Sequence, residues 1–176
     1  MRSGESLEGL TREQLMELIQ AYSRNWLAMD GVWFQSIERK YGMDEAMYHD
    51  VEAWKRFTVT EARRIKKFLG LPEHPGLEGL KQALSFRFYA NLSHYGFEER
   101  ENGLLYRNLD CRVQQARLEK GLGLHPCKPA GEVEYAGFAR TIDDRIACRC
   151  VSCCPDVTDE SCACAWLFTL EPDCTV

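Results

Sequence analysis

Apolar residues in the first half of the chain recur every three or four positions, the spacing that places side chains on one face of a helix. Thr11 and Gln14 form a capping-box pattern ahead of the first apolar stripe, and Gly70 with Pro72 ends the second. The pattern predicts three helices, over residues 11–42, 47–70 and 77–90. The N-terminal half is therefore expected to be helical.

From Gly96 onward the pattern changes to short runs bounded by turn residues. Asn102-Gly103 separates two of these runs and suits a type I′ hairpin turn, because both residue types tolerate a positive φ. Asp110 is placed to cap the helix that follows, and Gly121 to end it. The predicted elements are strands 96–101 and 104–109, helices 111–120 and 129–142, and strands 145–153 and 162–170.

These elements predict an α+β fold, in which a helical N-terminal half of about three helices packs with a ββααββ antiparallel-sheet C-terminal half. The sheet is expected to have about four strands with the helices on one face. Residues 1–95 form the helical region, and residues 96–176 form the cysteine-rich α+β region. Because the linker candidate, residues 71–79, is short and 176 residues suit one domain, we expect one compact unit.

Composition and charge limit the classes of partner. Hydrophobic residues make up 45% of the chain and charged residues 28%, as in an ordinary globular protein. The formal net charge is −5 and no run of Lys and Arg is interleaved with aromatics, which argues against a nucleic-acid partner. Met1–Leu10 lack an apolar segment behind a basic start, and no stretch of about 18 apolar residues occurs, so we expect a cytoplasmic protein without a membrane partner.

The cysteines are the most informative residues. All nine lie between Cys111 and Cys174, and the residues before Cys111 include none. Thiols in a reducing cytoplasm stay reduced unless they bind metal or take part in chemistry, so a disulfide framework is the weaker interpretation. The chemistry is expected in the C-terminal half.

Cys150 and Cys153 have the two-residue spacing that lets two sulfurs reach one metal ion or cluster. A zinc or iron–sulfur centre needs about four ligands, so partners must come from elsewhere, and Cys111 with Cys127 are the first choice. The isolated pair can instead be a dithiol redox couple. The reserve ligands are Cys154 and Cys164.

Cys111 and Cys127 each stand at the start of a predicted helix. Unpaired amides and the positive end of the helix dipole favour a thiolate at both positions, so either can be a catalytic nucleophile as well as a ligand. His125 is the histidine that stands nearest in sequence to serve as a base. The plain alternative is that both cysteines are small hydrophobic residues at helix ends.

The remaining candidates are carboxylates and strand cysteines. The carboxylates on or beside the apolar stripes are Asp30, Glu38, Asp50 and Glu61. A buried acid is either paired or functional, and the cations nearest in sequence to Glu61 are Arg63 and Arg64.

By the two-residue period of a strand, Cys162, Cys164 and Trp166 are expected to share one face. Cys148 and Cys162 are expected in the core. Cys174 is assigned no role.

Longer motifs extend across the chain. They are Asn25–Phe34, Val51–Phe57, Glu61–Lys66, Cys111–Gln114, Pro126–Lys128, Glu134–Tyr135, Ile142–Asp143, Arg149–Cys153, Pro155–Asp156 and Cys164–Trp166. With these motifs the sequence resembles, over nearly its whole length, an uncharacterised family of cysteine-rich proteins labelled simply cytosolic protein, found largely in anaerobic bacteria and archaea. The anaerobic source of that family favours an iron–sulfur cluster slightly over zinc.

A thinner outline consists of Cys111 opening one helix, Cys127 preceding the next, and the strand from Cys164 through Trp166 to Phe168. With this outline the segment 111–168 is distantly similar to the C-terminal part of L-2-amino-thiazoline-4-carboxylic acid hydrolases, which open a sulfur-containing ring. The resemblance implies a hydrolase with a cysteine nucleophile. The final hairpin is also similar, at the level of fold, to small-molecule-binding domains of the 4-vinyl-reductase type.

Three functions remain open at this stage. The first is a thiolate-ligated zinc or iron–sulfur site at Cys111, Cys127, Cys150 and Cys153, in a small enzyme or a redox-linked small-molecule-binding protein. The second is a hydrolase of a small cyclic amide or thiazoline with Cys111 or Cys127 as nucleophile. The third is a non-catalytic ligand-binding or scaffold protein whose apolar pocket is shaped by Trp26, Trp33 and Trp54. All three imply a small-molecule ligand or substrate, and the oligomeric state stays open.

Overall fold

The computed structural model describes residues 7–101 and 103–170, so Asn102 of the predicted turn and Cys174 lie outside the described residues. The elements in chain order are α1 (Arg12–Tyr41), α2 (Met43–Leu69), α3 (Gly76–Leu84), β1 (Tyr95–Arg100), β2 (Gly103–Asn108), α4 (Arg112–Glu119), α5 (Lys128–Ile142), β3 (Ile146–Cys153) and β4 (Cys164–Leu170), with short 3₁₀ turns at Leu7–Gly9 and Ala90–Leu92. This order confirms the predicted α+β fold, with a helical N-terminal half and a ββααββ second half.

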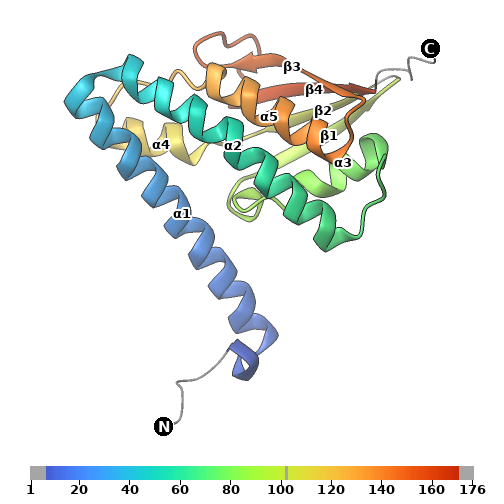
Figure 1. Ribbon diagram of the computed structural model, residues 1–176. Helices are drawn as coiled ribbons and strands as arrows, with labels where there is room; N and C mark the ends of the chain where they lie inside the picture. The colour runs from blue at the N-terminus through green and yellow to red at the C-terminus, as the bar shows by residue number, and fades with distance from the viewer. Residues whose placement is uncertain (1–6, 102, 171–176) are drawn as a thin grey trace.

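The four strands in the described residues form one antiparallel sheet in the order β1-β2-β4-β3. Alternate residues of the inner face, such as Trp166 and Phe168, pack with α2, α3 and α5 into the main core. Helix α5 lies along the sheet and α2 packs along α5 (Figure 1). The helices that complete the core therefore cover one face of the sheet, as predicted.

The outer face of the sheet carries a small cluster of Leu105, Cys162 and Ala165. Cys162 is buried there, but the prediction that it shares the face of Cys164 is wrong. The reason is that β4 begins only at Cys164, whose side chain packs against the main core, so strand alternation does not extend back to Cys162.

Helix α1 begins where the capping box predicts. The Thr11 side chain accepts a hydrogen bond from the Gln14 backbone N–H, and the Gln14 side chain accepts one from the Thr11 backbone N–H. The helix then runs to Tyr41, and its N-terminal half extends away from the rest of the molecule (Figure 1). In the part of the chain that the structure describes, no helix is both long and apolar enough to cross a bilayer.

The third helix ends at Leu84 rather than near Ala90. Beyond it the chain turns so that the buried Arg87 donates to Glu61 of α2, at 3.0 and 2.8 Å, and to Glu134 of α5, at 2.6 Å. Glu61 does point inward, but its predicted partners in the same helix are wrong. Arg87 comes from outside α2 and reaches the buried Glu61 carboxylate. Arg63 and Arg64, which are close to Glu61 in sequence, do not pair with it.

Asp110 does not cap α4, because its carboxylate is hydrogen-bonded to His94 instead. The His94 backbone N–H donates to Asp110 at 2.9 Å, and the His94 ring nitrogen lies 2.6 Å from the second oxygen. Cys111 is instead the N-cap residue of α4.

Candidate functional site

Three side chains from adjacent strands form a row across one end of the sheet. The antiparallel register pairs Asn108 of β2 with Cys164 of β4, and Cys164 with Cys153 of β3. An irregularity in β3 between Cys150 and Ser152 shifts its alternation and turns Cys153 to the inner face beside Cys164. The row lines a pocket that also includes the starts of α4 and α5.

Cys127 is the N-cap residue of α5, and its sulfur lies 3.5 Å from the sulfur of Cys153. The hydrogen bond from the Cys153 thiol lowers the pKa of Cys127 to about 7, against the opposing effect of burial. The same contact, with a second one to Cys164, raises the pKa of Cys153. Cys127 is therefore the sulfur of the pair that loses its proton first, close to neutral pH.

Gln114 of α4 fixes the segment that leads into Cys127. Its side-chain amide accepts a hydrogen bond from the His125 backbone N–H at 2.9 Å and donates to the His125 carbonyl at 2.8 Å. The same amide nitrogen lies 3.7 Å from the Cys127 sulfur. The sequence alone assigned Gln114 no role, and the available signal was its place three residues after Cys111 on one helix face.

The opposite wall of the pocket comes from α1 and α2. Asp30 of α1 lines it together with Asp50 and Trp54 of α2. The His125 Nε2 atom lies 3.4 Å from an Asp50 carboxylate oxygen and 3.1 Å from the Met47 sulfur. Burial, and then the neighbouring Asp50, raise the pKa of Asp30 to about 6, so this acid exchanges its proton close to neutral pH.

These walls enclose a cavity of about 140 Å³. Two of its lining residues, Trp166, which is 1% exposed, and Asn108, each carry a buried polar atom without a hydrogen-bond partner among the described residues: the Trp166 indole N–H and the Asn108 Oδ1. A Cβ atom at Gly131 of α5 would lie 2.6 Å from the Trp166 ring, so α5 approaches this strand as closely as glycine allows. Since buried polar atoms are normally paired, the cavity offers one donor and one acceptor to a small molecule.

A profile of one protein family matches residues 8–170. The chain belongs to DUF6125, a family of unknown function. A search of the curated proteins returns no match, and a search of the solved structures returns none either. The matched range includes every residue that lines the pocket, so the pocket lies wholly within the part of the chain that DUF6125 covers.

In this DUF6125 protein the pocket brings together three of the four predicted metal ligands, Cys111, Cys127 and Cys153. Cys164, a reserve ligand by sequence, lines the same pocket. Cys150 lines a separate cleft beside Lys128, Glu132 and Cys148. Cys111, Cys127, Cys153 and Cys164 therefore share one pocket, although no three of their sulfur atoms lie within 4.8 Å of one another.

Cys111 differs from Cys127 in protonation. Burial raises the pKa of Cys111 to about 11, although backbone N–H groups of α4 at Gln114 and Val113 oppose the change. The predicted thiolate at Cys111 is therefore wrong, because desolvation disfavours its charge more than the helix N-terminus favours it.

Other residues singled out from the sequence serve the fold of this DUF6125 protein. The Glu38 carboxylate accepts two hydrogen bonds from the Arg117 guanidinium, both at 2.8 Å, which ties the end of α1 to α4. Trp54 lines the pocket, whereas Trp33 is 64% exposed and Trp26 stacks on Phe57. The interpretation in which three tryptophans shape the pocket is therefore wrong for Trp26 and Trp33.

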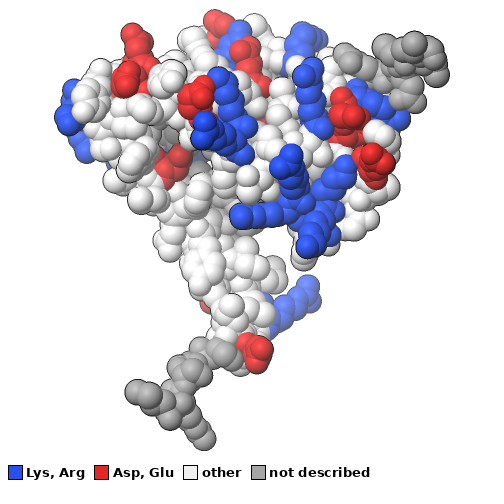
Figure 2. Space-filling model, viewed as in Figure 1, with Lys and Arg blue, Asp and Glu red and all other residues white. Residues whose placement is uncertain are grey.

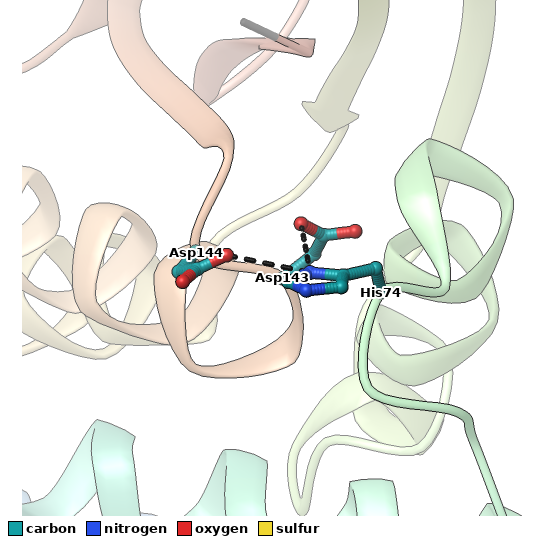
Figure 3. A group of neighbouring side chains, drawn as sticks. All are labelled: His74, Asp143 and Asp144. Atoms are coloured by element: carbon teal, nitrogen blue, oxygen red, sulfur yellow. Dashed lines mark ion pairs between the residues drawn. The ribbon is translucent and has the colours of Figure 1, made fainter. Parts of the chain in front are cut away.

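His74, Asp143 and Asp144 form the one group among the described residues whose three potential ligand atoms lie within 4.8 Å of one another (Figure 3). The Asp143 carboxylate already accepts hydrogen bonds from the Gly76 backbone N–H at 2.9 Å and from the Arg145 guanidinium at 3.0 and 2.9 Å. Those bonds hold the start of α3 against the end of α5. We therefore assign this group a structural role.

Proposed function

We propose that this protein is an enzyme that uses the Cys127 sulfur as a nucleophile toward a small molecule held in the pocket. The observation that carries the proposal is the position of that sulfur, at the start of α5, 3.5 Å from the Cys153 thiol and lining the cavity of about 140 Å³. The thiolate is the reactive form of cysteine, and both the neighbouring thiol and the helix N-terminus stabilise it. The pKa of Cys127, lowered to about 7, agrees with this role.

The reaction class we propose is hydrolysis of a small cyclic amide or thiazoline, and the distant similarity to thiazoline hydrolases supports it. For an amide, the Cys127 sulfur attacks the carbonyl carbon, and the nitrogen leaves with a proton from His125. Water then attacks the thioester and gives its proton to His125. This step releases the carboxylic acid and restores the thiolate. Asp50, 3.4 Å from the His125 Nε2 atom, orients the imidazole ring.

Two polar atoms at the cavity support recognition of such a group. The Trp166 indole N–H can donate to a ligand oxygen, and Asn108 Oδ1 can accept from a ligand N–H. Both atoms are buried without partners among the described residues, so binding of a complementary ligand satisfies them.

Alkylation by iodoacetamide tests this proposal. Mass-spectrometric mapping between about pH 5 and pH 9 should find Cys127 labelled first, with a rate that rises around pH 7 because the thiolate is the reactive form. In a panel of small cyclic amides and thiazolines, Cys127→Ala should abolish hydrolysis and the matched variant Cys154→Ala should retain it. Faster labelling of another cysteine at pH 7, or hydrolysis that survives Cys127→Ala, would overturn the assignment.

A second candidate function is binding of zinc or an iron–sulfur cluster by Cys111, Cys127, Cys153 and Cys164. Its support is that all four line one pocket. The 3.5 Å between the Cys127 and Cys153 sulfurs is also close to the separation of about 3.8 Å between two ligands of tetrahedral zinc. A metal held there would supply Lewis-acid or electron-transfer chemistry, with Cys127 as a ligand rather than a nucleophile.

Metal analysis of protein purified without oxygen separates the two candidates. Stoichiometric zinc or iron that is lost in Cys164→Ala and kept in Cys150→Ala would support the four pocket cysteines, because the Cys150 sulfur lines the other cleft. Loss in Cys150→Ala instead would favour the ligand set expected from the sequence spacing. Wild-type protein that is free of metal and retains rapid labelling at Cys127 would reject the metal site.

A further inference from the structure

One side of α1 carries an apolar seam that remains largely exposed, although Trp26 within it stacks on Phe57 of α2. The seam consists of Ile19, Tyr22, Trp26, Met29 and Trp33, whose side chains are exposed by 56, 60, 44, 63 and 64%. Their spacings alternate between three and four residues, which aligns them along one side of a helix. The seam is thus continuous over about four turns of α1 at about 3.6 residues per turn.

The seam runs from the N-terminal half of α1, which carries Ile19 and Tyr22, into the C-terminal half, which carries Met29 and Trp33. The buried residues of α1 are Ser23 and Phe34, on another side of the helix. The N-terminal half of α1 extends away from the body in Figure 1, and in Figure 2 the side of that projection in view is mostly uncharged, with isolated acidic and basic side chains. A half-helix that stands alone is marginal in water, and a contiguous exposed apolar surface marks an interaction site.

We infer that α1 of a second copy of this chain covers the seam, so that the protein is a two-fold symmetric dimer. Alternation of three and four residues is the pattern by which two helices pack side by side, with each seam residue fitting between residues of the partner. A second copy supplies an identical seam, and a two-fold axis lets the two surfaces complement each other.

The exposed area agrees with a dimer contact. The five seam side chains expose on the order of 600 Å² of largely apolar surface, given about 150–250 Å² for each large side chain. A stable interface buries about 800 Å² on each partner, which the seam and a narrow rim supply. The exposed Met16 extends the apolar surface toward the start of the helix.

The charge distribution favours a second copy over other occupants. Asp30 is the charged residue nearest the seam, and it lines the pocket, whereas Glu17 and Arg24 fall on the opposite side of α1 by its rotation of about 100° per residue. Two uncharged seams can meet without like-charge repulsion. The net charge of −5 makes the other surfaces of two copies repel each other, so contact through the seam is favoured. The seam has no flanking cluster of Lys and Arg, which an anionic lipid surface or a nucleic acid would require.

Sedimentation equilibrium of the full chain tests the dimer, between about 1 and 100 µM, because dimers respond to concentration. The expected mass at the upper end is twice 20.3 kDa. The double variant Met29→Glu, Trp33→Glu should raise the dimer Kd by on the order of 100-fold, since it places charge on the two most exposed seam residues. The matched control Asn25→Glu, Ala28→Glu adds the same charge at exposed positions off the seam and should leave the Kd unchanged.

Three results would overturn the dimer: a mass of 20.3 kDa throughout, a dimer that the seam variant leaves intact, or a monomer that binds neutral phosphatidylcholine vesicles through the seam. If the glutamate variant fails to fold by circular dichroism, hydrogen exchange on the wild-type chain decides instead. Protection of residues 15–33 must rise with protein concentration, and protection that does not change excludes a helix-to-helix dimer. None of these readouts depends on the activity proposed for Cys127.

Discussion

At the scale of single residues, Cys111 and Cys127 show that a helix N-terminus does not by itself make a cysteine reactive. Both are N-cap residues and both line the pocket. Cys127 receives a hydrogen bond from the Cys153 thiol, and its pKa falls to about 7, whereas burial raises the pKa of Cys111 to about 11. The neighbouring donor, more than the helix dipole, therefore decides which sulfur carries charge.

The Cys153 thiol, which donates this hydrogen bond, can be removed by substitution. In Cys153→Ala the hydrogen bond that lowers the pKa of Cys127 is lost, and the pKa should rise toward the ordinary value of a cysteine. The rate of iodoacetamide labelling at Cys127, followed against pH, should then fall by roughly tenfold or more at pH 7, because a smaller fraction is thiolate. Cys154→Ala serves as the control and should not move the curve. A curve unchanged in Cys153→Ala would mean that another group stabilises the thiolate.

At the scale of elements, Arg87 joins α2 to α5 from a segment that belongs to neither. Its guanidinium is 3% exposed, donates to Glu61 and Glu134, and lies 4.7 Å from the Tyr89 ring centre and 4.8 Å from that of Phe138. Burial raises the pKa of Glu134, and the charge of Arg87 opposes that change. Arg87 is the cation that neutralises the two buried carboxylates of Glu61 and Glu134. Removing it should therefore lower the free energy of unfolding.

Arg87→Met should therefore destabilise the protein by about 3–5 kcal/mol, because it leaves Glu61 and Glu134 facing each other without a buried cation. Urea denaturation followed by circular dichroism measures the change. Arg117→Met is the matched substitution, and its cost should be smaller because Glu38 reaches solvent more easily than Glu61. Equal costs for the two variants would show that the burial of the Arg87 cluster contributes little.

At the scale of the whole molecule, the sequence predicted what local chemistry controls. The capping box set the start of α1, Gly70 set the end of α2, and both predicted hairpins are present. The predicted turn at Asn102-Gly103 is wrong for Gly103, which pairs with Arg100 as the first residue of β2 and has no positive φ. The end of α3 was missed because the contact of Arg87 with Glu61 joins residues that are not neighbours in sequence.

The residues of the candidate site were likewise predicted in part, where local sequence determines them. Cys127 and Cys153 could be named from spacing and helix starts alone. The irregularity in β3 turns Cys153 to the inner face beside Cys164, and Cys164 lies next to Asn108 because β4 inserts between β2 and β3. Both facts depend on strand register, and strand register follows from packing across the whole sheet.

The close approach of Gly131 to Trp166 has a consequence for how such sequences can vary. With 2.6 Å between a Cβ atom at position 131 and the indole ring, an alanine there and a tryptophan at position 166 exclude each other unless α5 moves. Moving α5 would shift Cys127 away from Cys153. Among relatives that keep this pocket, the two positions should therefore change together, with a smaller ring or an aliphatic side chain at 166 wherever 131 is not glycine.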